Sequence, residues 1–216
     1  MNRRDLMKRE FGKTLLRMAE EKPLEDITVS ELAKECGVSR GTFYNHFFDI
    51  YDLINWMFEV DIVEPLQEYI IAHDTSWLGI TQQCLERMYE HRNFYCQAVR
   101  YTGQNNLQDY MRKRNLDSWK LLIKGYMGET KSFDPDLLDF YERFTADAVA
   151  NMVIEWAKRG MRTPPERMAH MDYVATRGIY GLIDAANAQE IPDSAMRSAN
   201  VPKEALRQLT GDSDRS

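Results

Sequence analysis

Residues 28–47 read T-V-S-E-L-A-K-E-C-G-V-S-R-G-T-F-Y-N-H-F, and this stretch decides the fold. Thr28, followed three residues later by Glu31, has the pattern of a capping box, in which two side chains satisfy backbone N–H groups at a helix start. That helix is predicted to run to about Cys36, because Gly37 can adopt the left-handed backbone that ends many helices. The spacing therefore predicts a short helix that ends in a tight turn.

A second short helix is predicted to follow Ser39, which can cap it. Phe43 and Phe47 lie one turn apart, so both rings can be buried on one face. The opposite face then carries Arg40, Gly41, Tyr44 and Asn45. Arg and Asn can make paired hydrogen bonds to base edges, and a bare glycine lets another backbone come close. This outward face suits the major groove of DNA.

Other polar groups in the stretch can hydrogen-bond to phosphates, which position a protein on DNA without reading its sequence. The candidate DNA-binding residues are Thr28, Ser39, Arg40, Gly41, Thr42, Tyr44, Asn45 and His46. The alternative is an ordinary helical hairpin within an all-helical core. Exposed Tyr44 and Asn45 would add nothing to the packing of such a hairpin, which favours DNA binding.

The same twenty residues resemble the DNA-binding signature of the TetR family of transcriptional regulators. That signature is roughly T-x-x-x-I-A-x-x-A-G-V-S-x-G-T-x-Y-x-H-F, followed by a turn that contains Lys. The matching positions here are Thr28, Ala33, Gly37, Val38, Ser39, Gly41, Thr42, Tyr44, His46 and Phe47. Ile50 stands where the family usually has the Lys that touches phosphate, so the resemblance does not extend to that contact.

The composition indicates a soluble chain with one small and one larger domain. It has 216 residues, a net charge of −6 and no run near the roughly 18 apolar residues of a membrane span. The N-terminus lacks the apolar core of a secretory signal, and three cysteines without metal-like spacing fit a reduced compartment. We therefore expect a cytoplasmic protein that uses no membrane, metal or cofactor.

The acidic balance argues mildly against DNA binding. Residues 1–50, however, carry nine basic and nine acidic side chains, so this part of the chain is near neutral. Docking depends on the local field rather than on net charge. Such a protein would bind non-specific DNA weakly and would depend on a dimer that contacts two half-sites.

Helical periodicity runs along almost the whole chain, and no alternating strand pattern stands out. We therefore predict an all-α fold: a helix-turn-helix DNA-binding domain at residues 1–50, then a helical effector-binding and dimerisation domain at 51–187. Residues 188–216 are polar, punctuated by proline and poor in aromatics, which predicts a mostly disordered tail.

The helices expected outside the central motif span residues 5–20, a fourth helix from Asp49 or Asp52 to an end or kink at Pro65, and residues 76–89, 94–101, 107–127 and 136–158. A last helix is predicted with Thr163 as its cap, Pro164 at its first position and Glu166 at its third.

The last two helices carry apolar stripes that suit a dimer interface. The stripe on the first is Leu137, Tyr141, Phe144, Ala148, Met152 and Trp156, and the second carries the small residues Ala175, Gly178, Gly181 and Ala185. In the TetR family the last two helices pair with their mates as a four-helix bundle, so the resemblance implies a homodimer. The competing interpretation is that these stripes complete the core of the monomer. Dimerisation is favoured, because a helix-turn-helix reads two half-sites about one DNA turn apart.

Further segments are similar to one branch of the family, which includes regulators of dihydroxyacetone kinase operons. They are W-M-F at 56–58, H-R-N-F-Y at 91–95, G-Q-N-N-L at 103–107 and E-W-A-K-R-G at 155–160. The resemblance implies a cavity in the larger domain for a small-molecule effector whose identity the sequence does not reveal. The candidate lining residues are Tyr95, Tyr110, Trp119 and Phe144, although plentiful aromatics are as consistent with a core as with a pocket.

Enzyme classes find little support in the sequence. It has no phosphate-binding glycine loop, nucleophile elbow, H-E-x-x-H motif or cysteine cluster, and its four histidines are scattered. The sequence therefore predicts a homodimeric regulator that binds double-stranded operator DNA and represses in response to a ligand. Two alternatives stay open: a transcriptional activator, and a co-regulator that acts mainly through a protein partner.

Overall fold

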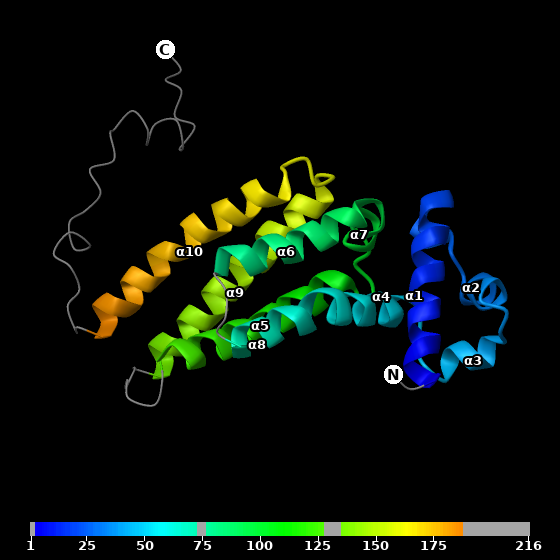
Figure 1. Ribbon diagram of the computed structural model, residues 1–216, viewed down its shortest axis with the longest axis horizontal. Coiled ribbons are helices and arrows are strands. Elements are labelled where there is room, and N and C mark those ends of the chain that lie inside the picture. The colour runs from blue at the N-terminus through cyan, green and yellow to red at the C-terminus, as the bar shows by residue number, and fades with distance from the viewer. Residues whose placement is uncertain (1–2, 73–76, 128–134, 188–216) are drawn as a thin grey trace, which may run out of the picture. The chain divides into compact units, whose positions relative to one another are not determined.

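The computed structural model describes residues 3–72, 77–127 and 135–187, and the prediction for the tail at 188–216 lies outside them. This part of the chain is helical throughout and contains no strand, which confirms the all-α prediction (Figure 1). The elements are α1 (Arg3–Glu21), η1 (Leu24–Asp26), α2 (Val29–Glu35), α3 (Arg40–Tyr44), α4 (Ile50–Phe58), η2 (Glu59–Val63), α5 (Glu64–Ala72), α6 (Trp77–Glu90), α7 (Arg92–Ala98), α8 (Leu107–Met127), α9 (Pro135–Lys158) and α10 (Pro165–Asn187).

Residues up to Gly178 belong to one compact unit, and the described residues from Ile179 on belong to a second, in which they are helical. No helix within the described ranges is long and apolar enough to cross a membrane.

The predicted capping box is present at the start of α2. The Glu31 backbone N–H donates to Thr28 Oγ1 at 3.2 Å, and the Thr28 N–H donates to Glu31 Oε2 at 3.0 Å. Gly37 has φ +68°, the left-handed turn that the sequence predicts, and the Thr42 N–H donates to Ser39 Oγ at 3.1 Å to cap α3. Local side-chain chemistry thus sets the angle between α2 and α3.

An aromatic cluster fixes α3 against α1. Phe43 and Phe47 are both buried, and their ring centroids lie 5.2 and 6.4 Å from that of fully buried Phe11. The same buried cluster continues through α4, α6 and α7 to α9 and α10. The core is therefore continuous from the recognition motif into the larger helical region, so a movement of one can be felt by the other.

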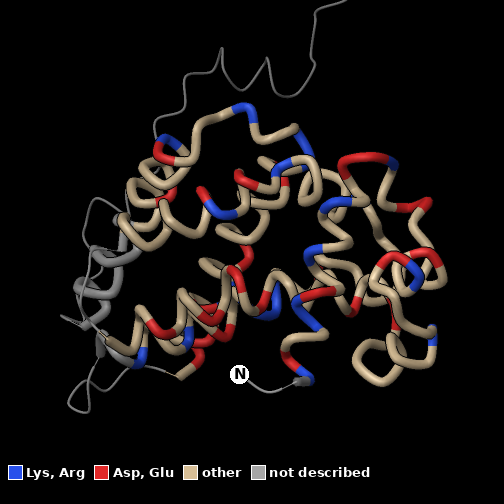
Figure 2. The backbone as a smooth tube through the Cα atoms, turned by 45° about the vertical axis from the view of Figure 1, so that its right-hand side comes forward, with Lys and Arg blue, Asp and Glu red and all other residues tan. Residues whose placement is uncertain are grey.

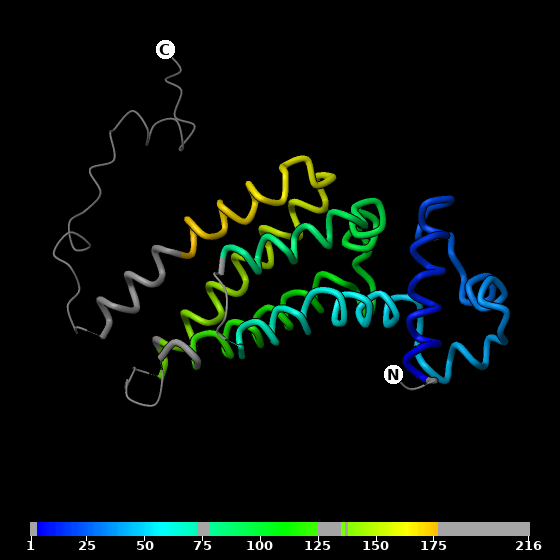
Figure 3. Tube along the Cα trace, in the orientation of Figure 1, coloured from blue at the N-terminus to red at the C-terminus, as the bar shows by residue number. Residues whose placement is uncertain are grey.

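Helix α4 begins as predicted at Asp49, whose Oδ1 accepts the Asp52 N–H at 2.7 Å. The sequence predicted an end or a kink at Pro65. The chain instead passes through the π-helical turn η2 just before Pro65 and continues as α5 (Figure 3). Because Pro65 has no N–H, the carbonyl of Asp61 four residues earlier loses its usual donor, and Arg87 Nη1 supplies one at 3.0 Å.

Helix α10 begins at Pro165, one residue later than predicted. Two consecutive prolines can each stand at the first helical position, since neither has an N–H to lose. The Pro164 carbonyl accepts the first helical bond, from the Met168 N–H at 3.0 Å, so Pro164 precedes the helix. The Thr163 carbonyl accepts from Trp156 Nε1 at 2.8 Å and ties this turn to the end of α9. Gly160, with φ +80°, closes α9 as expected.

Helix α9 has two apolar faces, only one of which is buried. The buried face holds Ala146, Ala150, Ile154, Trp156 and Ala157. Phe144 and Ala148 of the predicted stripe are exposed, as is Phe140, while the side chain of Leu137 lies outside the described residues. On α10, Met171, Val174 and Ala175 are exposed, and nothing is described of the side chains from 177 on, which include Gly178, Gly181 and Ala185.

Candidate DNA-binding site and cavity

The outward face of α3 is formed as the sequence predicts. Arg40, Gly41 and Asn45 are exposed, and half of the Tyr44 side chain is accessible. The Arg40 guanidinium lies 5.9 Å from the Tyr44 ring centroid, with Nη2 3.5 Å from the phenol oxygen. Tyr44 therefore supports the side chain that is best suited to read a guanine.

The hydroxyl candidates lie at the starts of the two short helices. Thr28 and Ser39 are exposed, and Thr42 is half-buried. Ser39 Oγ and Thr42 Oγ1 are 3.0 Å apart, so one donates to the other. Their capping bonds hold these hydroxyls in place, and each oxygen keeps hydrogen-bonding capacity for a neighbouring molecule.

His46 is held against the core. Its ring centroid lies 6.2 Å from that of Phe11, and its Nδ1 is buried without a hydrogen-bond partner within the described residues. Burial, followed by the nearby charges of Arg4 and Lys8, lowers the pKa of His46, so the ring is neutral at pH 7. Because an unsatisfied buried donor is costly, the proton belongs on Nε2, which can then donate to a phosphate.

The N-terminal turn of α1 also reaches the recognition motif. Arg4 Nη2 donates to the Asn45 carbonyl at 3.4 Å, at the end of α3. Lys8 Nζ lies 5.3 Å from the Phe47 ring centroid and 5.4 Å from that of Trp56. Acidic and basic residues are interspersed along the whole described backbone (Figure 2), so this motif has cations without being a strongly basic surface.

The loop at residues 101–106 connects the recognition motif with the larger helical region. Asn105 Nδ2 donates to Asp49 Oδ2 at 3.0 Å, and Asn55 Nδ2 donates to the Asn105 carbonyl at 2.9 Å. Tyr101 stacks on Tyr51 with ring centroids 3.5 Å apart and planes 5° apart. The loop thus holds the first turn of α4, next to the motif. Sequence reasoning used part of this segment only for its resemblance and missed this contact, because nothing local indicates the partner.

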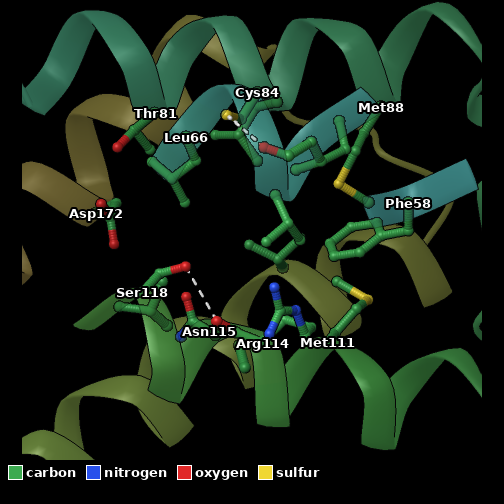
Figure 4. Close-up of a pocket in the computed structure, with 16 residues that line it drawn as sticks. Phe58, Leu66, Thr81, Cys84, Met88, Met111, Arg114, Asn115, Ser118 and Asp172 are labelled. Atoms are coloured by element: carbon green, nitrogen blue, oxygen red, sulfur yellow. Dashed lines mark hydrogen bonds between the residues drawn. The ribbon is translucent and has the colours of Figure 1, made fainter. Parts of the chain in front are cut away.

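A cavity of about 90 Å³ lies between the helices of the larger region (Figure 4). Its walls come from α4, η2 and α5 on one side and from α6, α8, α9 and α10 around the others. They are lined by Phe58, Ile62, Val63, Leu66, Thr81, Cys84, Leu85, Met88, Met111, Arg114, Asn115, Ser118, Val149, Ala150, Val153 and Asp172.

None of the four residues that the sequence suggested for an effector site lines this cavity. Tyr95 is fully buried in the main core, and Trp119 is buried in a small cluster with Ile123 and Ala146. The Tyr110 hydroxyl donates to Glu59 Oε2 at 2.6 Å, and Phe144 is 58% exposed. The sequence shows that these residues are aromatic, whereas the direction of each side chain depends on packing between distant helices.

An ion-pair network borders the cavity where η2 begins. Arg114 donates through Nε at 2.8 Å and through Nη2 to the Glu59 carboxylate, and through Nη1 to Asp117 Oδ2 at 2.8 Å. Hydrogen bonding to Glu59 raises the pKa of Arg114, so the guanidinium is charged at any working pH. Both acceptors are acidic, which leaves Arg114 fully engaged with protein carboxylates.

Other chemistry is weakly represented. Among the described residues no group of three or more His, Cys, Asp or Glu could hold a metal ion. Burial raises the pKa of the Cys36 thiol and raises that of Cys84 to about 11, so both are protonated and unreactive at neutral pH. This favours a packing role for Cys36 over redox sensing.

A short outward-facing helix, capped after a tight turn and fixed by buried aromatics, defines a helix-turn-helix DNA-binding protein. Comparison with known families agrees. Residues 13–55 match the family described as bacterial regulatory proteins, tetR family, and residues 75–177 match a transcriptional regulator C-terminal region of the same family. Together these matches cover most of the chain, and the chain belongs to the TetR family of transcriptional regulators.

One solved structure extends the similarity to the fold. It is described as dihydroxyacetone kinase operon activator DhaS and superposes with a TM-score of 0.61 at 18% sequence identity. The match covers 81% of this chain and 96% of the other. At this identity the likeness concerns the fold alone. A comparison with curated protein sequences finds no match.

Proposed function

We propose that this TetR-family regulator is a homodimeric repressor that binds operator DNA through α3 and is released by a small-molecule effector. The observation that carries the DNA-binding part is the two-sided character of α3, with Phe43 buried and Arg40 and Tyr44 exposed. In this proposal residues 1–50 are the DNA-binding domain, and residues 51–187 bind the effector and dimerise.

The side chains of the motif divide by role. Arg40 and Asn45 read base edges in the major groove, whereas Tyr44, His46 and the hydroxyls of Thr28, Ser39 and Thr42 position the motif on phosphates. Gly41 lets the DNA backbone come close. Ile50, where the family usually has Lys, is 8% exposed and packs in the core, so this position adds no cation.

The exposed apolar face of α9 and α10 supports a dimer. Phe140 and Phe144 stack with ring centroids 5.8 Å apart, and each is 58% exposed. Met171 and Val174 on α10 are at least half exposed as well. A second copy of the chain would bury these side chains and would place two recognition helices on two half-sites.

The cavity is the proposed effector site, in place of the four aromatic residues that the sequence suggested. Phe58 at the end of α4 and Ile62 in η2 form part of its wall, so a ligand would touch the helix that leads back to the recognition motif. A ligand shifts DNA binding only if it binds one conformation more tightly than the other.

A second candidate function is transcriptional activation, which is suggested by the name of the structurally similar activator. The same DNA contacts serve both outcomes, because the position of the operator relative to the promoter decides between them. A co-regulator acting through a protein partner remains the other alternative, and 72% exposed Phe48 at the end of the motif is the feature that favours it.

Two substitutions test the assignment of α3. Arg40→Ala should cost about 1–3 kcal/mol on the preferred site and relax the preference at one base pair. Tyr44→Ala should weaken binding to all sequences to a similar degree, because it removes a phosphate contact. Arg159→Ala, an exposed change at the far end of α9, is the matched control and should bind DNA normally. If both motif variants fold and bind DNA as the parent does, α3 is not the recognition helix.

A further inference from the structure

Polar side chains gather at one end of the cavity. Thr81 of α6, Asp172 of α10, and Ser118 and Asn115 of α8 lie toward one side in Figure 4. Phe58, Met88 and Met111 lie toward the other. The cavity therefore has a polar end and an apolar end, and it suits a ligand that has both.

The hydrogen-bond donors of two of these polar groups are already used. Ser118 Oγ donates to the Arg114 carbonyl at 3.0 Å, and Asn115 Nδ2 donates to the Ala146 carbonyl at 2.5 Å. What remains for a ligand is the acceptor capacity of the Ser118 hydroxyl oxygen and of Asn115 Oδ1. The Asp172 carboxylate, on a residue only 1% exposed, is a further acceptor. The polar end is thus rich in acceptors.

The charges around the cavity favour a cation. Arg114 is the basic residue in the lining, and its guanidinium is engaged by the carboxylates of Glu59 and Asp117. With Asp172 included, these four charged residues carry a net negative charge. An anionic ligand would have to displace a protein carboxylate from Arg114, whereas a cation would meet the acceptors directly.

Size limits the ligand further. A volume of about 90 Å³ corresponds to about three water molecules at their share of the liquid volume. An ammonium group carries three donors and no acceptor, which complements an acceptor-rich site. We propose that the cavity binds a small primary alkylamine as its ammonium ion. The head group meets Asp172, Ser118 and Asn115, and the alkyl chain lies toward Phe58 and Met111.

This inference rests on the proposed function, since it names the chemical class of the effector. The alkyl end of the ligand contacts Phe58 and Ile62, on α4 and η2. Occupancy therefore bears on the turn from which α4 runs back to Asp49 and the recognition motif. The predicted regulatory effect is a change in DNA affinity when the amine binds.

The test is a calorimetric titration of the DNA-free protein with three probes of equal length: n-butylamine, n-butanol and butyrate. Butylamine is protonated at pH 7, as a lysine side chain is. Because binding energy per ligand atom is limited, the titrations extend to about 10 mM probe. Butylamine should bind at least about tenfold more tightly than butanol, and butyrate more weakly still, because one charge-assisted hydrogen bond supplies that factor.

Four variants sharpen the result. Asp172→Asn and Ser118→Ala should each reduce the preference for amine over alcohol, and Ala150→Leu should fill the cavity and weaken both probes. Glu68→Gln removes an exposed carboxylate of α5 outside the cavity and should leave the preference unchanged. Ser118→Ala is informative even if Asp172→Asn proves unstable, because it deletes a single hydroxyl.

Butanol or butyrate binding as tightly as butylamine would overturn the proposal, as would no amine binding at all or an undiminished preference in Ser118→Ala. The titration contains no DNA, so its failure leaves the assignment of α3 untouched. Loss of DNA binding in the variants of α3 would equally leave the amine site untouched, and the two proposals fail separately.

Discussion

Asn105 offers a sharp test of how the larger region holds the recognition motif. It has a left-handed backbone, with φ +59°, and its side chain donates to Asp49, the cap of α4. Asn105→Gly keeps this backbone and the carbonyl that Asn55 binds, and removes only the side-chain bond. Asn105→Ala removes the same bond and also places a Cβ in a left-handed conformation.

The expected losses follow from these two terms. A side-chain hydrogen bond of this kind contributes about 0.5–1.5 kcal/mol, and the left-handed conformation costs an alanine about 1–2 kcal/mol more. We therefore expect the free energy of unfolding to fall by about 1 kcal/mol in Asn105→Gly and by about 2–3 kcal/mol in Asn105→Ala.

Urea unfolding measures both losses. Gln104→Gly, an exposed change in the same loop, controls for the flexibility that any added glycine brings. Asp49→Asn keeps a good capping residue but removes the charge, so its combination with Asn105→Gly should cost less than the sum of the two changes. If Asn105→Gly matches Gln104→Gly, or if Asn105→Ala costs no more than Asn105→Gly, the loop does not hold α4 in this way.

Three further predictions concern the turns, the histidine and the dimer. Gly37→Ala and Gly160→Ala should each cost about 1–2 kcal/mol in urea unfolding, because both have positive φ and no atom within 4 Å of an added Cβ; a neutral outcome would contradict this. The lowered pKa of His46 means that the unfolded chain takes up a proton more readily, so stability should fall as the pH drops below about 6.5. His46→Gln should lessen that fall in urea titrations at several pH values, and an unchanged pH profile would argue against it. Phe144→Lys, with Phe140 left in place, should give a folded monomer in analytical ultracentrifugation, and an intact dimer would place the interface elsewhere.

The recognition motif could be predicted from sequence because its determinants are local. The bond between Thr28 and Glu31 spans three residues, and the turn at Gly37 requires one backbone conformation. Phe43 and Phe47 lie one turn apart, so periodicity alone indicates a shared buried face. Signals of this kind need no knowledge of the rest of the fold.

The cavity and the contacts around it could not be predicted, because their partners are far apart in the chain. Asn105 meets Asp49 across 56 positions, and Arg114 meets Glu59 across 55. Periodicity on α9 indicates an apolar stripe, but it does not say whether Phe144 turns toward the core or toward a second chain. The start of α10 was misplaced by one residue for a different reason, since Pro164 and Pro165 suit the first helical position equally well.

The most direct test of the central claim is selection of binding sites from a random pool of duplex DNA, followed by fluorescence-anisotropy titration of the selected site across salt concentrations. A dimer with about four phosphate contacts per half-site should give a log–log salt slope near −7. The selected sites should carry two related half-sites about one helical turn apart, or a multiple of it, and bind well above scrambled DNA. Recovery of no preferred sequence, with equally weak binding to every duplex at low salt, would contradict a sequence-specific regulator.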